Sequence, residues 1–152
     1  MSVPHMHALG SFGCAIAHYT VIKDAYLRGF ENILIFEDDF RINDMETFEH
    51  TVNAFRQSGF DYANLILGRN NDSELFLRQA LSSDDISAAA AYMLSRKGME
   101  YFIDRYENDL TYSDNIVYNI RSVKDIKIGI STKWPCCYEK VDEGNIDYSF
   151  KK

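Results

Sequence analysis

The chain has 152 residues, of which 46% are hydrophobic and 14% are aromatic, and only two are prolines. This composition indicates one globular domain over residues 1–152 and excludes a long disordered tail. The net charge of −7 and the pI near 5.0 argue against nucleic acid or an anionic membrane surface as the main partner.

The first residues and the cysteines indicate the compartment. Met1 to Gly10 lack the basic segment and apolar core of a signal peptide, and no apolar run approaches the roughly 20 residues that span a bilayer. The three cysteines, Cys14, Cys136 and Cys137, are odd in number, and the last two are neighbours that cannot easily pair. We therefore expect a cytoplasmic protein with reduced thiols. Because neither a Cys-x-x-Cys nor a His-x-x-x-His spacing occurs, we expect no zinc site.

The first predicted element is a helix. Met1 to Phe12 has no regular pattern, and we expect its His5 and His7 to be solvated. From Gly13 to Phe30, apolar residues recur at spacings of three and four, which predicts an amphipathic helix. Gly29 is expected to end this helix.

Next comes the most informative stretch of the chain, Asn32 to Phe40, where an apolar run stops at Glu37, Asp38 and Asp39. The run predicts a strand that is buried on both faces, with the carboxylates at its tip, where open α/β sheets bind ligands. Three adjacent carboxylates repel one another unless a cation neutralises them. Mg²⁺ or Mn²⁺ bridging to a substrate phosphate would do so. The alternative is a solvated turn before a helix cap.

The rest of the chain alternates helical patterns with short apolar runs. In chain order we expect a helix capped by Asn43 or Asp44 and ending near Gly59, a strand over Asn64–Leu67, a short helix over Glu74–Leu81, a strand over Ala88–Leu94, a helix from Ser95, a short helix from Asp114 to about Ile120, and a strand over Ile126–Ile130. The polar stretch Arg69–Asp85 is either a binding loop or a surface insertion. Together these elements predict a three-layer α/β domain.

Four motifs then follow in a fixed order. They are Gly10-Ser11-Phe12-Gly13-Cys14-Ala15-Ile16-Ala17-His18, Ile35-Phe36-Glu37-Asp38-Asp39, Ala91-Tyr92-Met93-Leu94-Ser95-Arg96-Lys97-Gly98, and the aspartate before a helix, Asp114. This series resembles the family 25 glycosyltransferases, which include bacterial lipooligosaccharide and collagen galactosyltransferases. The family pattern looks like G-x-x-G-C-x-x-S-H, E-D-D and Y-x-x-S-x-x-G. The resemblance covers most of the chain from Gly10 to about Ile120.

The resemblance implies a GT-A fold, the nucleotide-diphospho-sugar transferase type. It also implies transfer of a hexose, with inversion, from a UDP-linked donor to a saccharide or hydroxylated acceptor. Glu37, Asp38 and Asp39 would be the counterpart of a D-x-D signature. Asp39, together with Glu37, would then bind Mn²⁺ or Mg²⁺ on the donor diphosphate, and Glu37 and Asp38 would hold the ribose or the hydrogen bonds of the site.

Three further residues take roles from the same resemblance. Inverting transfer needs a base for the acceptor proton, and Asp114 is our candidate, with a helix N-cap as the alternative. His18 matches the histidine of the family's Ser-His pair and would line the donor site, although spacing alone is typical of a core or capping residue. Lys97 is either a diphosphate contact or a solvated charge.

Two departures from the family pattern stand out. Ala17 occupies the position where the family usually has serine. Family members also normally carry an N-terminal strand and helix with an N-L-x-x-R-x-x-R-like segment, and this chain starts after it. We therefore expect a shortened GT-A domain, which is a trimmed enzyme, a part completed by another chain, or an inactive relative.

A second hypothesis is a non-catalytic binding or assembly module that kept the fold. It predicts a homo-oligomer that covers an exposed sheet edge. A metal-dependent phosphohydrolase using the same carboxylates is a third hypothesis, but no aspartyl nucleophile motif supports it.

Overall fold

A computed structural model describes residues 4–66, 74–82, 84, 89–109, 111–133 and 135–138, without the side chains of residues 4–9, 137 and 138. Its helices and strands, in chain order, are α1 (Pro4–Leu27), β1 (Asn32–Phe36), β2 (Phe40–Ile42), α2 (Met45–Ser58), β3 (Tyr62–Asn64), β4 (Leu77–Gln79), β5 (Ala91–Ser95), α3 (Arg96–Asp109), α4 (Ser113–Asn119), the 3-10 turn η1 (Ile120–Ser122), β6 (Ile128–Ser131) and β7 (Cys136–Tyr138).

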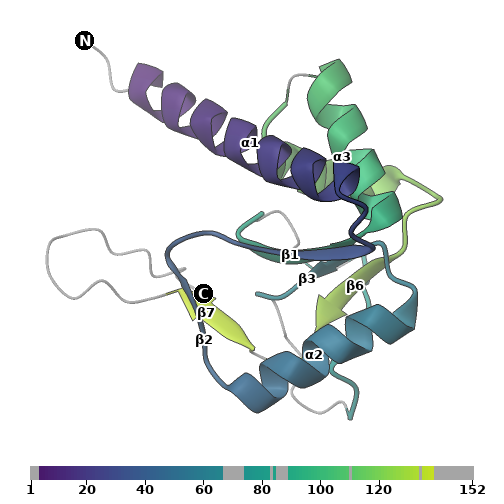
Figure 1. Ribbon diagram of the computed structural model, residues 1–152. Helices are drawn as coiled ribbons and strands as arrows, with labels where there is room; N and C mark the ends of the chain where they lie inside the picture. The colour runs from purple at the N-terminus through teal and green to yellow at the C-terminus, as the bar shows by residue number, and fades with distance from the viewer. Residues whose placement is uncertain are drawn as a thin grey trace, which may run out of the picture.

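Five of these strands form one mixed sheet in the order β1-β5-β3-β6-β4, and β2 and β7 form a separate pair. Within the large sheet, β3 and β6 run parallel, whereas β1 with β5, β3 with β5 and β4 with β6 are antiparallel. Helices α1 and α3 cover one face of this sheet, and α2 covers the other (Figure 1). The predicted three-layer α/β arrangement is therefore confirmed.

Strand β1 lies at an edge of the sheet, where β5 is its neighbour. The prediction that this strand is buried on both faces is wrong, because an edge strand leaves part of its surface to solvent. Leu34 is 37% exposed, whereas Ile35 on the opposite face is buried. The pairing of Phe36 with Ala91 nevertheless fixes the end of β1 beside the start of β5.

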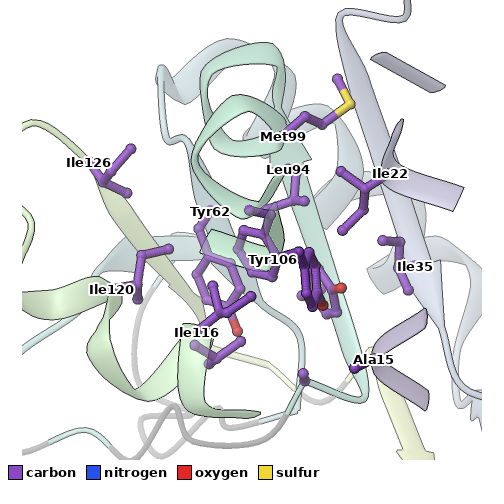
Figure 2. Packing of buried hydrophobic residues seen from close by; sticks show 14 of the residues in the cluster. Ala15, Ile22, Ile35, Tyr62, Leu94, Met99, Tyr106, Ile116, Ile120 and Ile126 are labelled. Carbon is purple, nitrogen blue, oxygen red and sulfur yellow. The ribbon is translucent and has the colours of Figure 1, made fainter. Parts of the chain in front are cut away.

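The core on the α1 and α3 side is built around three stacked aromatic rings. Tyr92 lies 5.7 Å from Tyr62 and 5.6 Å from Phe102, measured between ring centroids, and all three side chains are fully buried. Figure 2 shows Tyr62 together with Leu94 and Ile22 in this cluster. Because side chains alternate along a strand, Ala91 and Met93 of β5 point to the other face and pack with Phe55 of α2. The two sides of β5 thus hold the three layers together.

Gly98, in the first turn of α3, lies against Asp61, the residue just before β3. A Cβ added there would overlap the backbone oxygen of Asp61, which accepts a hydrogen bond from the amide of Ser95. We expect Gly98→Ala to lower the free energy of unfolding by about 1–3 kcal/mol, since backbone atoms have to move. Urea unfolding measures this change.

The matched control is Gly10→Ala in α1, because a Cβ at Gly10 would meet none of the described residues within 4 Å apart from its chain neighbours and the backbone of its own helix. Since alanine is the better helix former by up to ~1 kcal/mol, this variant should be as stable as the wild type or more so. Equal stability of the two variants would contradict the close approach of α3 to Asp61.

Most predicted helix ends are confirmed, because each depends on local chemistry. The Asp44 side chain accepts a hydrogen bond from the amide of Thr47 at 2.8 Å and caps α2. Gly29 and Gly59 have φ values of 81° and 73° after α1 and α2, and this left-handed conformation favours glycine. The Ser95 hydroxyl accepts from the third residue of the next helix at 3.2 Å, which marks the start of α3.

The start of α1 differs from the prediction. The helix begins at Pro4 instead of Gly13, so the predicted start of this helix is wrong. Proline suits the first position of a helix, where its missing N–H has no partner to bond. The side chains of His5 and His7 lie outside the described part of the chain. Among the described residues, no helix combines the length and apolar character needed to cross a bilayer.

The predicted strands are confirmed as β3, β5 and β6, each shifted by one to three residues, but the short helix predicted over Glu74–Leu81 is wrong. This segment instead forms β4, in which Leu77 pairs with Ser131 of β6. Pairing with a strand distant in sequence outweighs local helix propensity here. Much of the polar stretch Arg69–Asp85 lies outside the described residues.

Candidate functional site

The three adjacent carboxylates lie in the turn that joins β1 to β2, and the backbone places them beside α4. The amide of Glu37 donates to the carbonyl of Ala90 at 2.9 Å. One residue earlier, the amide of Ala89 donates to Oδ1 of Asp114 at 2.9 Å. Glu37 and Asp114 therefore both bond the short segment just before β5, although they are far apart in the sequence.

His18 enters this site from α1. Its side chain is buried, with 6% of the residue exposed, and its Nδ1 forms a 2.6 Å hydrogen bond with the hydroxyl of Tyr92. The two rings also stack, with centroids 5.7 Å apart and an interplanar angle of 13°. The other ring nitrogen, Nε2, lies 3.6 Å from Oε1 of Glu37. The ring is thus held by the core on one side and faces the acidic turn on the other.

Cys14 lies one helical turn before His18, so both side chains project from the same face of α1. Its thiol donates to Oε1 of Glu37 at 3.5 Å. Burial, followed by the nearby negative charge of Glu37, raises the pKa of Cys14 to about 11. Cys14 was not among the residues we expected in the site, since we considered only Cys-x-x-Cys and His-x-x-x-His spacings. The signal that could have found it is the Cys-x-x-x-His spacing on a helix.

Asp39 has a buried carboxylate oxygen, Oδ1, that lacks a hydrogen-bond partner among the described residues. Burial is the main cause that raises the pKa of Asp39, and the charges of Glu37 and Asp38 raise it further. Asp38 itself is exposed. A buried acceptor without a donor, next to two like charges, is suited to a hard cation that takes oxygen ligands.

Asp114 is exposed in the first turn of α4. The alternative that it caps this helix is wrong, because the helix begins at Ser113 with Tyr112 at the cap position and no side-chain capping bond. Its carboxylate instead binds the amide of Ala89. It therefore lies at the rim of the acidic turn with its charge accessible to solvent.

Lys97 is the one predicted site residue that the structure does not bring to the turn. It donates to the backbone oxygen of Asp125 and lies 3.9 Å from Oδ2 of Asp61. Because β5 runs antiparallel to β1, with its last residue opposite the first residue of β1, Lys97 lies at the far end of this strand pair from Glu37.

A protein-family model matches most of the chain. The model described as glycosyltransferase family 25 (LPS biosynthesis protein) matches residues 6–117. This range contains α1 from Met6 onward, the acidic turn and Asp114, and so every residue of the site described above. A comparison with curated proteins gave no match.

Proposed function

Because the chain belongs to glycosyltransferase family 25, we propose that it moves a hexose from a UDP-linked sugar to a hydroxyl of a saccharide or other acceptor, with inversion. Family membership supports transferase activity in general and implies a sugar donor and an acceptor. The finer assignment depends on one observation, the buried Oδ1 of Asp39 that lacks a hydrogen-bond partner among the described residues. The three-layer α/β arrangement supports a GT-A type of domain.

We assign the donor diphosphate to the acidic turn. Asp39, together with Glu37, would hold Mn²⁺ or Mg²⁺, since carboxylate oxygens are the ligands that these hard ions prefer. When bound, such an ion acts as a Lewis acid toward the negative charge of the leaving nucleoside diphosphate. Asp38 is exposed beside them, and its carboxylate can accept hydrogen bonds from the ribose hydroxyls.

We assign the general base to Asp114. Inverting transfer forms a bond from the acceptor oxygen to the anomeric carbon while the bond from that carbon to the diphosphate oxygen breaks. The electron pair of the broken bond leaves with UDP, and the acceptor hydroxyl must lose its proton. The Asp114 carboxylate is exposed to solvent and is fixed by the amide of Ala89. It can therefore accept that proton without losing its anchor.

Titration with UDP tests the donor assignment. We expect wild-type protein to bind UDP in the presence of Mn²⁺, and Asp39→Asn to bind it at least about tenfold more weakly, because a charged contact is worth ~1.5–3 kcal/mol. Isothermal titration calorimetry with and without Mn²⁺ measures both. Asp109→Asn, which changes an exposed aspartate at the end of α3 that pairs with Arg105, is the matched control and should bind UDP as the wild type does. If the wild type binds no UDP at millimolar concentration, the transferase assignment is wrong and the non-catalytic module takes its place.

A further inference from the structure

Cys14, His18 and Glu37 bring three different ligand atoms to one point between α1 and the end of β1. One sulfur, nitrogen or oxygen atom from each residue lies within 4.8 Å of the other two. The shortest separations run to Oε1 of Glu37, 3.5 Å from the sulfur of Cys14 and 3.6 Å from Nε2 of His18. Ligand atoms around a tetrahedral ion with bonds of about 2.0–2.3 Å lie roughly 3.5 Å apart. The side chains therefore need little movement to surround an ion.

The three side chains are held by the fold and do not meet by chance on a surface. Cys14 and His18 are one turn apart on a long helix that packs on the sheet. Glu37 is fixed by the hydrogen bond from its own amide to Ala90. His18 bonds the hydroxyl of Tyr92 through Nδ1 and so directs Nε2 to the carboxylate. Histidines that bind metals are typically oriented in this way, by a hydrogen bond at the second ring nitrogen.

The chemistry of these atoms selects the class of ion. Thiolate, imidazole and carboxylate are the ligands that Zn²⁺ takes in proteins, whereas Mg²⁺ and Mn²⁺ prefer oxygen ligands alone. We propose that Cys14, His18 and Glu37 form a binding site for a borderline-soft divalent ion of the zinc class, with the fourth position open to water or a substrate oxygen. When the ion binds, the Cys14 thiol gives its proton to solvent and its sulfur takes the metal bond. This reverses the expectation from spacing that the chain holds no zinc site.

The site is distinct from the one assigned to the donor diphosphate. The two share Glu37, whose carboxylate has two oxygens, but they differ in every other ligand and in the hardness of the ion. The present inference therefore does not depend on sugar transfer.

Cobalt titration tests the site directly, because Co²⁺ bound to a thiolate absorbs in the near ultraviolet. We expect the metal-free wild-type protein to bind one Co²⁺ per chain with this thiolate band, and Zn²⁺ to displace it. Cys14→Ser should lose the band although Cys136 and Cys137 remain. An absent band in the wild type, or an unchanged band in Cys14→Ser, would overturn the proposal.

Circular dichroism would reveal whether Cys14→Ser folds. If it does not fold, two further variants still test the site. Tyr92→Phe removes the hydroxyl that orients His18 and should keep the thiolate band while weakening Co²⁺ binding by about 10- to 100-fold. Glu37→Gln removes a charged ligand and should also weaken Co²⁺ binding. Wild-type Co²⁺ affinity in both variants would contradict the site.

Asp39→Asn separates this proposal from the proposed function. We expect this variant to lose Mn²⁺-dependent UDP binding and to keep the cobalt band. If the variant loses UDP binding but even the wild type shows no cobalt band, only the zinc-class site fails. If the cobalt band is present but the wild type binds no UDP, the proposed transferase function fails and the zinc-class site stands.

Discussion

Asp114→Asn is expected to lower kcat for sugar transfer by about 10²- to 10⁴-fold, the usual contribution of a general base. An asparagine side chain cannot take the acceptor proton. Its amide oxygen can still accept the hydrogen bond from Ala89, so the start of β5 should keep its place. Release of UDP from UDP-hexoses in the presence of saccharide acceptors measures kcat.

Two comparisons sharpen the Asp114 experiment. The affinity for UDP should stay near the wild-type value, because Asp114 is assigned to the acceptor proton and not to the donor. Asp109→Asn again serves as the control and should keep the wild-type kcat. A variant Asp114→Asn with wild-type kcat and a wild-type melting temperature would move the base to another residue.

Asp84→Asn is expected to lower the free energy of unfolding by about 2–4 kcal/mol, between the value of one charged hydrogen bond and that of a fully buried ion pair. Asp84 is 6% exposed and accepts two hydrogen bonds from Arg78, at 2.7 and 2.8 Å, and one from the amide of Leu81 at 2.7 Å. The substitution leaves the Arg78 charge partly buried without its counterion. Urea unfolding at neutral pH measures the loss.

The same ion pair predicts a dependence on pH. The hydrogen bonds from Arg78 are the main cause that lowers the pKa of Asp84 below its ordinary value of 3.8. A lowered folded-state pKa means that this stabilisation is fully present above that ordinary value and is lost as the pH falls through the folded pKa. Asp84→Asn should therefore lack this part of the acid-induced loss of stability.

The control for Asp84 is Asp104→Asn. Asp104 pairs with Arg105 at 2.5 Å, but both side chains are exposed, and exposed ion pairs contribute about 0–1 kcal/mol. If Asp84→Asn and Asp104→Asn lower the free energy of unfolding equally, burial does not strengthen the ion pair of Asp84.

Features of the fold that depend on local interactions were predicted from the sequence, whereas features that depend on contacts between distant residues were not. The ends of α2 depend on Asp44 and Gly59, whose own side chain or backbone conformation makes the cap, and both were predicted. Strands β4 and β7 depend on partners far along the chain, since Leu77 pairs with Ser131 and Ile42 with Cys136. No local pattern states such a pairing, so neither strand was predicted.

The burial of β1 was predicted wrongly for a related reason. Its apolar sequence is typical of a strand with neighbours on both sides. The number of neighbours is a property of the whole sheet, and β1 lies at its edge.

The order of the motifs along the chain indicated which residues belong to the site. It did not indicate how far apart these residues lie in the structure. The structure places His18 and Asp114 on either side of Glu37 and its neighbours Ala89 and Ala90. Lys97 belongs to the same motif as Tyr92. A strand advances about 3.3 Å per residue, so Lys97, which follows the last residue of β5, lies at the end of this strand that is distant from Glu37. Cys14 was missed because the Cys-x-x-x-His spacing on α1 was not used, and because Glu37 comes from a turn that is distant in sequence.

The stacked rings beneath α1 limit which core substitutions this protein can accept. His18 stacks on Tyr92, and the Tyr92 ring stacks on both Tyr62 and Phe102, so the ring that holds His18 is itself part of the core. A cavity opened at Phe102 would remove packing from the Tyr92 ring and so loosen His18, which ties substitutions in this part of the core to the position of the imidazole beside Glu37.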